Sequence, residues 1–287
     1  MSKIKKVCVV GGGQMGRQIA LNAAVYGFEV NLTDSFPEVL EKVSAWASDY
    51  LNKRIEKGRL TAEAAQQILS RFHVRDTLAE AAAGADLVIE AIIEKQEEKE
   101  KLFRQLDALV REDTIITTNS SFLCSSLFTS CVRNPGRLAN LHYFNPALAM
   151  KLVEIVRNPQ TTDEVVEALR GFIKALDKIP VVLQKEVDGF IVNYISSALT
   201  CAALKLVAEG VATPEDIDLA MENGLNHPMG PFRLMDLTGI DLAYYVLADK
   251  AAKGEYHEGI DLVKAKYEAG EYGRKTGRGW YDYSEKK

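Results

Sequence analysis

The chain has 287 residues, of which 47% are hydrophobic and 26% are charged, and its formal net charge is −5. This composition is typical of a globular enzyme with one large or two modest domains. The acidic balance argues against a nucleic-acid-binding protein, which usually carries a basic stripe. The longest apolar runs are too short to span a bilayer. We therefore expect neither a nucleic-acid partner nor a membrane partner.

The cysteines and histidines indicate neither disulfides nor a metal site. Cys8, Cys124, Cys131 and Cys201 form no C-x-x-C pair, and the four histidines lack metal-ligand spacing. We expect reduced thiols, a cytoplasmic location and no bound metal. The short apolar run after the first lysines ends in glycines without a cleavage-type segment, which argues against a signal peptide.

The first predicted strand and helix enclose a dinucleotide-binding pattern. A β-branched run at 6–10 is followed by G-x-G-x-x-G at 11–16 and then by a helix-forming segment. Gly11 permits the tight turn, Gly13 lets the backbone approach a pyrophosphate, and Gly16 lets the helix pack on the strand. The helix N-terminus supplies N–H donors for the phosphates.

An acidic residue completes this pattern at the end of the second predicted strand, 28–34. Asp34 lies close to the spacing of about 20 residues expected for the carboxylate that accepts a ribose 2′-hydroxyl and repels a 2′-phosphate. The sequence therefore predicts NAD as cofactor. The alternative is a glycine-rich turn with a coincidental aspartate. The residues predicted for the cofactor turn are Gly11, Gly13, Gln14, Met15 and Gly16.

Residues 37–60 are predicted to form a helix with a basic face. Leu51 and Ile55 share one side, and Lys53 and Lys57 share the opposite side. On composition alone, a solvated helix face is the favoured interpretation. The functional alternative is a grip on an anionic ligand, such as the phosphates of coenzyme A.

The next strands deliver polar residues to one edge of the predicted sheet. Residues 86–92 form a continuous apolar run, typical of a parallel strand covered on both faces, and a helix is expected over 94–109. Glu94 either touches the cofactor or favours the helix N-terminus. A strand at 114–118 leads to Asn119-Ser120-Ser121, where α/β folds bind ligands, although such residues also cap helices.

A histidine and a glutamate lie on neighbouring strand-like segments, 137–144 and 152–157, joined through the turn signal Asn145-Pro146. Oxidation of an alcohol needs a base that takes the hydroxyl proton, and an imidazole titrates near neutrality. A carboxylate can hold the ring in one tautomer and stabilise the imidazolium. His142 and Glu154 fit these roles; the alternative is a buried histidine with a coincidental partner.

The alternation of helix and strand ends after a helix at 165–176 and a strand at 179–183. Later patterns are helical over 191–209, 214–221 and 240–250, with a break at 228–232. We predict an α/β domain with a Rossmann-type doubly wound sheet at 1–186, followed by an all-helical C-terminal domain at 187–287. The apolar stretch 190–206 favours burial at an interface.

The chain resembles the 3-hydroxyacyl-CoA dehydrogenases over essentially its whole length, and its length resembles the short bacterial members, including 3-hydroxybutyryl-CoA dehydrogenase. The similar segments are 11–16, 88–94, 119–121, 142–156, 189–193, 215–218, 228–232 and 273–283. By this resemblance, His142 is the general base and Glu154 its orienting partner. Ser121 and Asn193 would hydrogen-bond the substrate oxygens and the histidine. Tyr194 stands where the family often has arginine.

The resemblance also implies the ligand contacts and the assembly. Lys57, with Lys53 beside it, becomes a grip for the phosphates of an acyl-CoA substrate, and the helical domain would form a homodimer. The residues that match the family's NAD contacts are Asp34, Glu94, Lys99, Ser121, Asn145 and Lys275.

The resulting hypothesis is reversible, NAD-dependent oxidation of a short-chain L-3-hydroxyacyl-CoA. One rival is a dehydrogenase of a free hydroxy acid, of the L-gulonate type. A 3-hydroxyisobutyrate or 6-phosphogluconate type would need a catalytic lysine in the crossing helix, where Lys205 lies near the far end. A third rival is a nucleotide-binding relative without catalysis.

Overall fold

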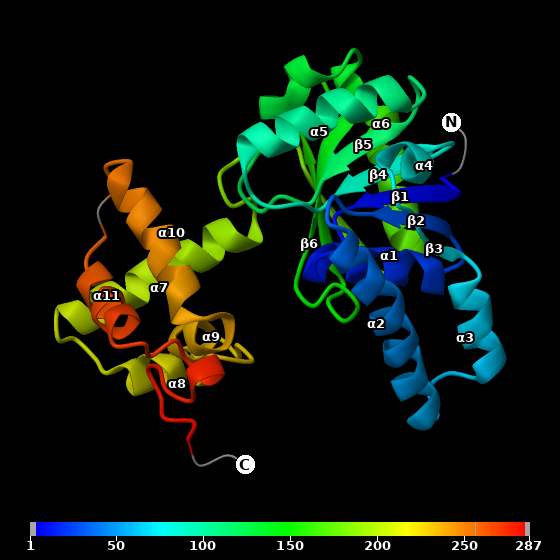
Figure 1. The fold of residues 1–287 in the computed structure, drawn as a ribbon. Coiled ribbons are helices and arrows are strands. Elements are labelled where there is room, and N and C mark those ends of the chain that lie inside the picture. Colours follow the sequence, from blue (N-terminus) through cyan, green and yellow to red (C-terminus); the bar gives the residue numbers. More distant parts are fainter. Residues whose placement is uncertain (1–3, 256, 285–287) are drawn as a thin grey trace. The chain divides into compact units, whose positions relative to one another are not determined.

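The computed structural model describes residues 4–255 and 257–284. The chain divides into two compact units, one up to Ile191 and one from Val192 onward (Figure 1). The first is an α/β unit and the second is helical, as the sequence predicts. We retain 1–186 and 187–287 as the proposed domain limits.

The first unit is built on one twisted sheet. Its strands are β1 (Lys6–Val10), β2 (Glu29–Thr33), β3 (Phe72–Val74), β4 (Leu87–Glu90), β5 (Ile115–Thr118), β6 (Leu138–Tyr143), β7 (Leu152–Arg157) and β8 (Ile179–Leu183). They lie in the order β3-β2-β1-β4-β5-β6-β7-β8, and only the β6–β7 pair is antiparallel. The strand order reverses between β1 and β4, which is where doubly wound sheets bind their ligands.

Helices cover both faces of this sheet (Figure 1). One face packs against α1 (Gln14–Val25), α2 (Pro37–Glu56), α3 (Ala62–Leu69) and α6 (Asp163–Ala175). The other packs against α4 (Leu78–Ala82), α5 (Gln96–Leu109) and the 3-10 helix η1 (Ser125–Cys131). Val7 and Val9 join the first core, and Cys8 and Val10 join the second. This alternation explains why the strands are apolar without interruption.

Short elements account for the main omissions from the sequence prediction. The elements α3, β3 and α4 hold eight, three and five residues, too few for a clear apolar period. The 3-10 helix η2 (Pro135–Arg137) immediately precedes β6. The helix predicted from residue 94 begins at Gln96, so Glu94 lies in the turn between β4 and α5.

The second unit packs its helices around one apolar cluster, which includes Leu204, Phe232, Met235 and Val263. Its elements are α7 (Val192–Ala208), α8 (Pro214–Gly224), α9 (Pro231–Thr238), α10 (Ile240–Ala252), α11 (Ile260–Glu268) and the 3-10 helix η3 (Arg274–Thr276). The sequence predicted neither α9 nor α11.

The break expected at 228–232 covers the end of the α8–α9 connection and the first two residues of α9. Pro231 takes its first position, where a missing N–H costs nothing. The buried Asp218 carboxylate accepts hydrogen bonds from the backbone N–H groups of Phe232 and Arg233, both at 2.9 Å. A side chain from α8 therefore caps α9, and this long-range cap leaves no local sequence signal.

A second buried aspartate holds the closing segment. Asp236 accepts hydrogen bonds from the backbone N–H groups of Trp280 at 2.9 Å and Tyr281 at 3.0 Å. In the part of the chain that the structure describes, no helix has the length and apolarity to cross a bilayer, and no three side chains form a cluster that could hold a metal ion.

Candidate active site

The glycine turn between β1 and α1 is shaped for close backbone approach. Gly11 has a φ of +110°, and a Cβ there would lie 2.4 Å from the carbonyl oxygen of Ala91. A Cβ on Gly16 would lie 1.8 Å from the carbonyl oxygen of Gly11. Both positions require glycine. A Cβ on Gly13 would meet no heavy atom within 4 Å, so there is room for a ligand to approach this part of the backbone.

The N-terminus of α1 is prepared for an anion. Its N-cap, Gly13, provides no side-chain hydrogen bond to the first turn, so the helix N–H groups point outward without a cap. Asp34 braces this turn from the end of β2, since its Oδ2 accepts a hydrogen bond from Gly12 N at 2.6 Å. These features fit the pyrophosphate and ribose of a dinucleotide.

The β6–β7 turn meets the same helix. Gln14 Nε2 donates a hydrogen bond to Asn145 Oδ1 at 3.1 Å. Lys178, which is buried, donates from its Nζ to the carbonyl oxygens of Ala147 and Met150, both at 2.7 Å. The turn that carries Asn145 is thus held at both ends, close to the glycine turn.

His142 and Glu154 face each other across the antiparallel pair β6–β7. His142 Nδ1 and Glu154 Oε2 lie 2.8 Å apart, and the side chains are only 4% and 1% exposed. Glu154 Oε1 accepts a second hydrogen bond from Ile191 N at 3.1 Å. Because a carboxylate can only accept here, Nδ1 must donate, and Nε2 is left as the basic nitrogen.

The loop after β5 brings a hydroxyl to that nitrogen. Ser121 Oγ and His142 Nε2 lie 3.1 Å apart. Asn119 Oδ1 accepts a hydrogen bond from Tyr143 N at 2.9 Å, which ties this loop to β6. Ser121, His142 and Glu154 therefore form one hydrogen-bonded line. Such a line can take a proton from an O–H group that reaches Nε2.

A buried ion pair lies beside this loop. Lys99 Nζ is 2.7 Å from Glu90 Oε1 and 3.1 Å from Glu94 Oε2. Ser120 Oγ donates a hydrogen bond to Glu94. Burial raises the pKa of Glu94, but Lys99 and the Ser120 hydroxyl outweigh burial and hold that pKa below its ordinary value. Glu90 lies inside the apolar run at 86–92, and its part in this ion pair was not predicted from the sequence. The available signal was one acid inside an apolar run, with a lysine nine residues later.

The two candidate phosphate-binding lysines are exposed. Lys53 Nζ forms an ion pair with Asp49 at 2.7 Å, and this hydrogen bond raises the pKa of Lys53. Lys57 follows the end of α2. Both interpretations, a solvated face and a phosphate grip, are compatible with this placement.

Two predicted residues belong to the second unit. Asn193 is the second residue of α7 and is half-buried. Lys275 lies in η3, and its Nζ pairs with both carboxylate oxygens of Asp241. Their roles toward substrate and cofactor stay predictions.

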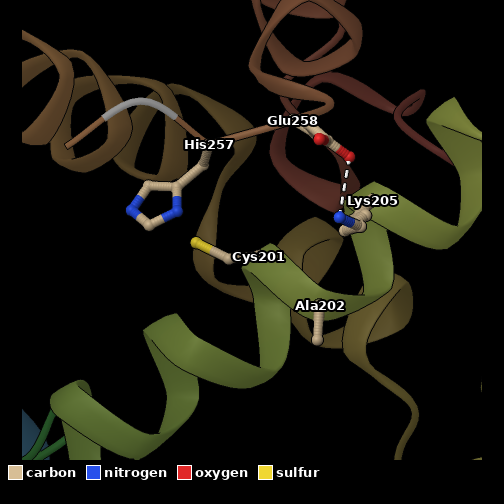
Figure 2. A pocket seen from close by; sticks show the side chains of 5 residues that line it. All are labelled: Cys201, Ala202, Lys205, His257 and Glu258. Atoms are coloured by element: carbon tan, nitrogen blue, oxygen red, sulfur yellow. Dashed lines mark ion pairs between the residues drawn. The ribbon is translucent and has the colours of Figure 1, made fainter.

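The second unit also holds a separate pocket of about 260 Å³. Figure 2 shows its lining residues, and the Lys205–Glu258 ion pair at 3.1 Å marks one side. The other lining residues are Cys201, Ala202 and His257. Burial raises the pKa of the Cys201 thiol, which makes it a poor nucleophile. None of the residues predicted for catalysis lines this pocket.

Comparison with known protein families finds two models that match consecutive parts of the chain. A family model described as "3-hydroxyacyl-CoA dehydrogenase, NAD binding domain" matches residues 6–187. A second, described as the C-terminal domain of the same family, matches residues 189–283.

Individual relatives match nearly the whole chain. A 3-hydroxybutyryl-CoA dehydrogenase of Bradyrhizobium diazoefficiens is 38% identical over 283 residues, which cover 98% of this chain and 96% of that protein. A crystal structure of 3-hydroxybutyryl-CoA dehydrogenase from Escherichia coli K12 has a TM-score of 0.92 and 36% identity; the match covers 100% of this chain but 61% of that one. The (S)-3-hydroxybutyryl-CoA dehydrogenase structure from Ralstonia eutropha has a TM-score of 0.88 and 36% identity, covering 98% and 100% of the two chains.

Proposed function

Because the chain belongs to the 3-hydroxyacyl-CoA dehydrogenase family, whose members are NAD-dependent oxidoreductases, we propose that it oxidises a short-chain L-3-hydroxyacyl-CoA reversibly to the 3-oxoacyl-CoA. The observation that carries this proposal is the line Ser121–His142–Glu154 at the ligand-binding edge of a sheet with a dinucleotide turn. The preference for a short chain rests on the relatives named 3-hydroxybutyryl-CoA dehydrogenase.

Proton transfer falls to His142. Its Nε2 accepts the proton of the substrate's 3-hydroxyl group while hydride leaves carbon 3, which carries that hydroxyl group. Glu154 keeps Nδ1 protonated and stabilises the imidazolium that forms. The Ser121 hydroxyl, which contacts His142 Nε2 in this structure, would hydrogen-bond the substrate oxygen and orient it toward the imidazole ring. General-base assistance of this kind contributes about 10² to 10⁴ in rate.

The residues around the glycine turn suit the binding of NAD. The open face at Gly13 and the uncapped α1 would hold the pyrophosphate, together with Gly11, Gln14, Met15 and Gly16. Asp34 would accept the adenosine ribose hydroxyls. Glu94 and Asn145 would lie on the nicotinamide side, and the family resemblance adds Lys275 as a proposed NAD contact. Bound NAD supplies the hydride acceptor.

The substrate contacts and the assembly complete the proposal. Lys53 and Lys57 would hold the CoA phosphates, and Asn193 a substrate oxygen. We propose a homodimer through the helical unit, because Tyr194 and Ile195 on α7 and Leu242 and Tyr245 on α10 are exposed. All four cysteines are free, which favours a reducing, cytoplasmic compartment.

Consumption of NADH tests the function. We expect saturation kinetics with acetoacetyl-CoA and little turnover with free acetoacetate, because only the former carries the CoA phosphates. Saturation by free acetoacetate at similar concentrations would replace the proposal with a free hydroxy-acid dehydrogenase. No consumption with either substrate, alongside normal NADH binding, would indicate a non-catalytic nucleotide-binding protein.

A further inference from the structure

Glu90 is a fully buried carboxylate with no part in the proposed proton transfer. It accepts hydrogen bonds from Lys99 Nζ at 2.7 Å, Thr118 Oγ1 at 2.6 Å and Ile92 N at 2.7 Å. A buried ion pair is weak evidence for stability, because desolvation offsets most of the attraction. A fully satisfied pair does fix the geometry of whatever it touches.

The geometry that it fixes is that of Glu94. Lys99 is 1% exposed and lies between two carboxylates, Glu90 at 2.7 Å and Glu94 at 3.1 Å. Its ammonium group is thus closed to direct contact with a ligand. Glu90, Glu94 and Lys99 form one charged cluster. Within this cluster Glu94, which is 40% exposed, is the residue that a ligand can reach. The family resemblance matches Lys99 to an NAD contact; with its ammonium group between the two carboxylates, Lys99 is placed to act on a ligand through Glu94.

The same cluster fixes the loop that carries Ser121. Ser120 donates its hydroxyl hydrogen to Glu94, and its oxygen accepts hydrogen bonds from Phe122 N at 3.2 Å and Leu123 N at 2.6 Å. Ser121 lies inside this loop with its Oγ 3.1 Å from His142 Nε2. A continuous series of contacts thus joins Glu90 to His142.

The cluster also lies on a defined side of the cofactor turn. The strand order reverses between β1 and β4, and this position is the switch point of the sheet. Asp34 follows β2 on one side of the switch point, and Glu94 follows β4 on the other. In doubly wound sheets, the two halves of a dinucleotide bind on the two sides of the switch point. With the adenosine ribose at Asp34, the nicotinamide half faces Glu94 and Ser121. Gly11 approaches Ala91 at the end of β4, so the turn and the cluster are neighbours.

Two carboxylates and one ammonium leave the cluster with one excess negative charge. Oxidised nicotinamide carries a positive charge that reduced nicotinamide lacks. We propose that Glu90 and Lys99 are positioning residues, which act through Glu94 and Ser120 to hold Ser121 on His142 and to favour the oxidised cofactor over the reduced one. This inference rests on the proposed function for its turnover effect, but its effect on affinity requires only that NAD binds.

The affinity effect is tested by measuring the Kd values of NAD⁺ and NADH for the wild type, Glu90→Gln and Glu97→Gln. Glu90→Gln removes the excess charge, so the ratio Kd(NAD⁺)/Kd(NADH) should rise about threefold to tenfold. Glu97→Gln removes an exposed charge from the same helix, α5, and should leave the ratio unchanged. A general loss of structure would weaken both ligands alike, so an unchanged ratio in Glu90→Gln overturns the charge effect.

The double variant Glu90→Gln/Lys99→Met separates charge from position and avoids leaving one buried charge unpaired. Glu94 then supplies the single negative charge, so the ratio should return to within about twofold of wild type. Ser121 loses its support, so kcat with acetoacetyl-CoA should fall about tenfold while KM changes little. A double variant with wild-type kcat would show that the pair is only structural. Failure of the wild type to reduce acetoacetyl-CoA would instead reject the proposed function.

Discussion

Glu154 on β7 and Glu90 next to the switch point are both fully buried carboxylates in one sheet. Each accepts a hydrogen bond from a backbone N–H group, that of Ile191 for Glu154 and that of Ile92 for Glu90. Their nitrogen-bearing side-chain partners differ: Glu154 faces the imidazole of His142, and Glu90 faces the ammonium of Lys99. A buried acid paired with a nitrogen-bearing side chain therefore appears twice, once with an imidazole and once with an ammonium group.

The two partners, an imidazole and an ammonium group, suit different roles: proton transfer and positioning. An imidazole gains and loses a proton near neutral pH, whereas an alkylammonium group remains charged there. The pair on β6 and β7 can therefore change its charge during a reaction. The pair at the switch point keeps its charge and can only hold groups in place. Substitutions on the two sides should consequently affect different measurements.

His142→Ala should have the largest effect. Loss of the base should lower kcat by about 10² to 10⁴ in the oxidation of 3-hydroxybutyryl-CoA, with NADH affinity almost unchanged. The matched control is His73→Ala, because His73 pairs with Glu29 at 3.4 Å on the exposed edge of the same sheet. An active His142→Ala enzyme would remove the distinction between the two buried acids.

Glu154→Gln should have the second-largest effect. The amide can no longer stabilise the imidazolium, so kcat should fall about 10- to 10³-fold, less than in His142→Ala. Steady-state kinetics of both variants under one set of conditions make this comparison. If Glu154→Gln kept wild-type turnover, Glu154 would have no part in proton transfer and would only position other groups, as Glu90 is proposed to do.

Lys57→Gln contrasts an exposed cation with the buried Lys99. If Lys57 holds a CoA phosphate, KM for acetoacetyl-CoA should rise about threefold to tenfold at unchanged kcat, and more weakly at high salt. Lys42 is an exposed lysine on α2, the helix that Lys57 follows, and Lys42→Gln should leave KM unchanged. Equal KM values in the two variants would favour the solvated helix face.

The pair that changes charge could be predicted from the sequence because its signals are local. His142 and Glu154 lie on two short apolar segments joined by Asn145-Pro146, and alternation along such strands fixes which side chains face each other. The glycine turn and Asp34 carry an equally local signal. The fold class followed from the end of the helix–strand alternation near Gly189.

The pair that keeps its charge could not be predicted in this way. Glu90 acquires its role only when α5 returns Lys99 to the end of β4 and the loop after β5 brings Ser120 to Glu94. Helix α9 was missed for the same reason, since its cap, Asp218, comes from α8. Contacts that join distant segments leave no periodic signal in one sequence.

The smallest expected effect concerns acid stability at the switch point. Burial raises the pKa of Glu94, but Lys99 and Ser120 lower it by more, so this pKa lies below the ordinary value of 4.5. A carboxyl group whose folded-state pKa is depressed stabilises the fold above its unfolded-state pKa, and this contribution is lost as the pH falls through the folded-state pKa. Because Glu94 is partly exposed, solvent screening keeps the effect small.

The wild type should therefore have a Tm about 2 °C above that of Glu94→Gln near neutral pH. The difference should shrink as the pH falls below 4.5, because the wild-type carboxylate becomes protonated. Glu97→Gln, which neutralises an exposed carboxylate in the first turn of α5, should show a smaller Tm difference at neutral pH. A Tm difference for Glu94→Gln that stayed constant with pH would mean that the Glu94 carboxylate is not held by Lys99. The charges at the switch point would then not be fixed, and the contrast with the pair on β6 and β7 would lose its basis.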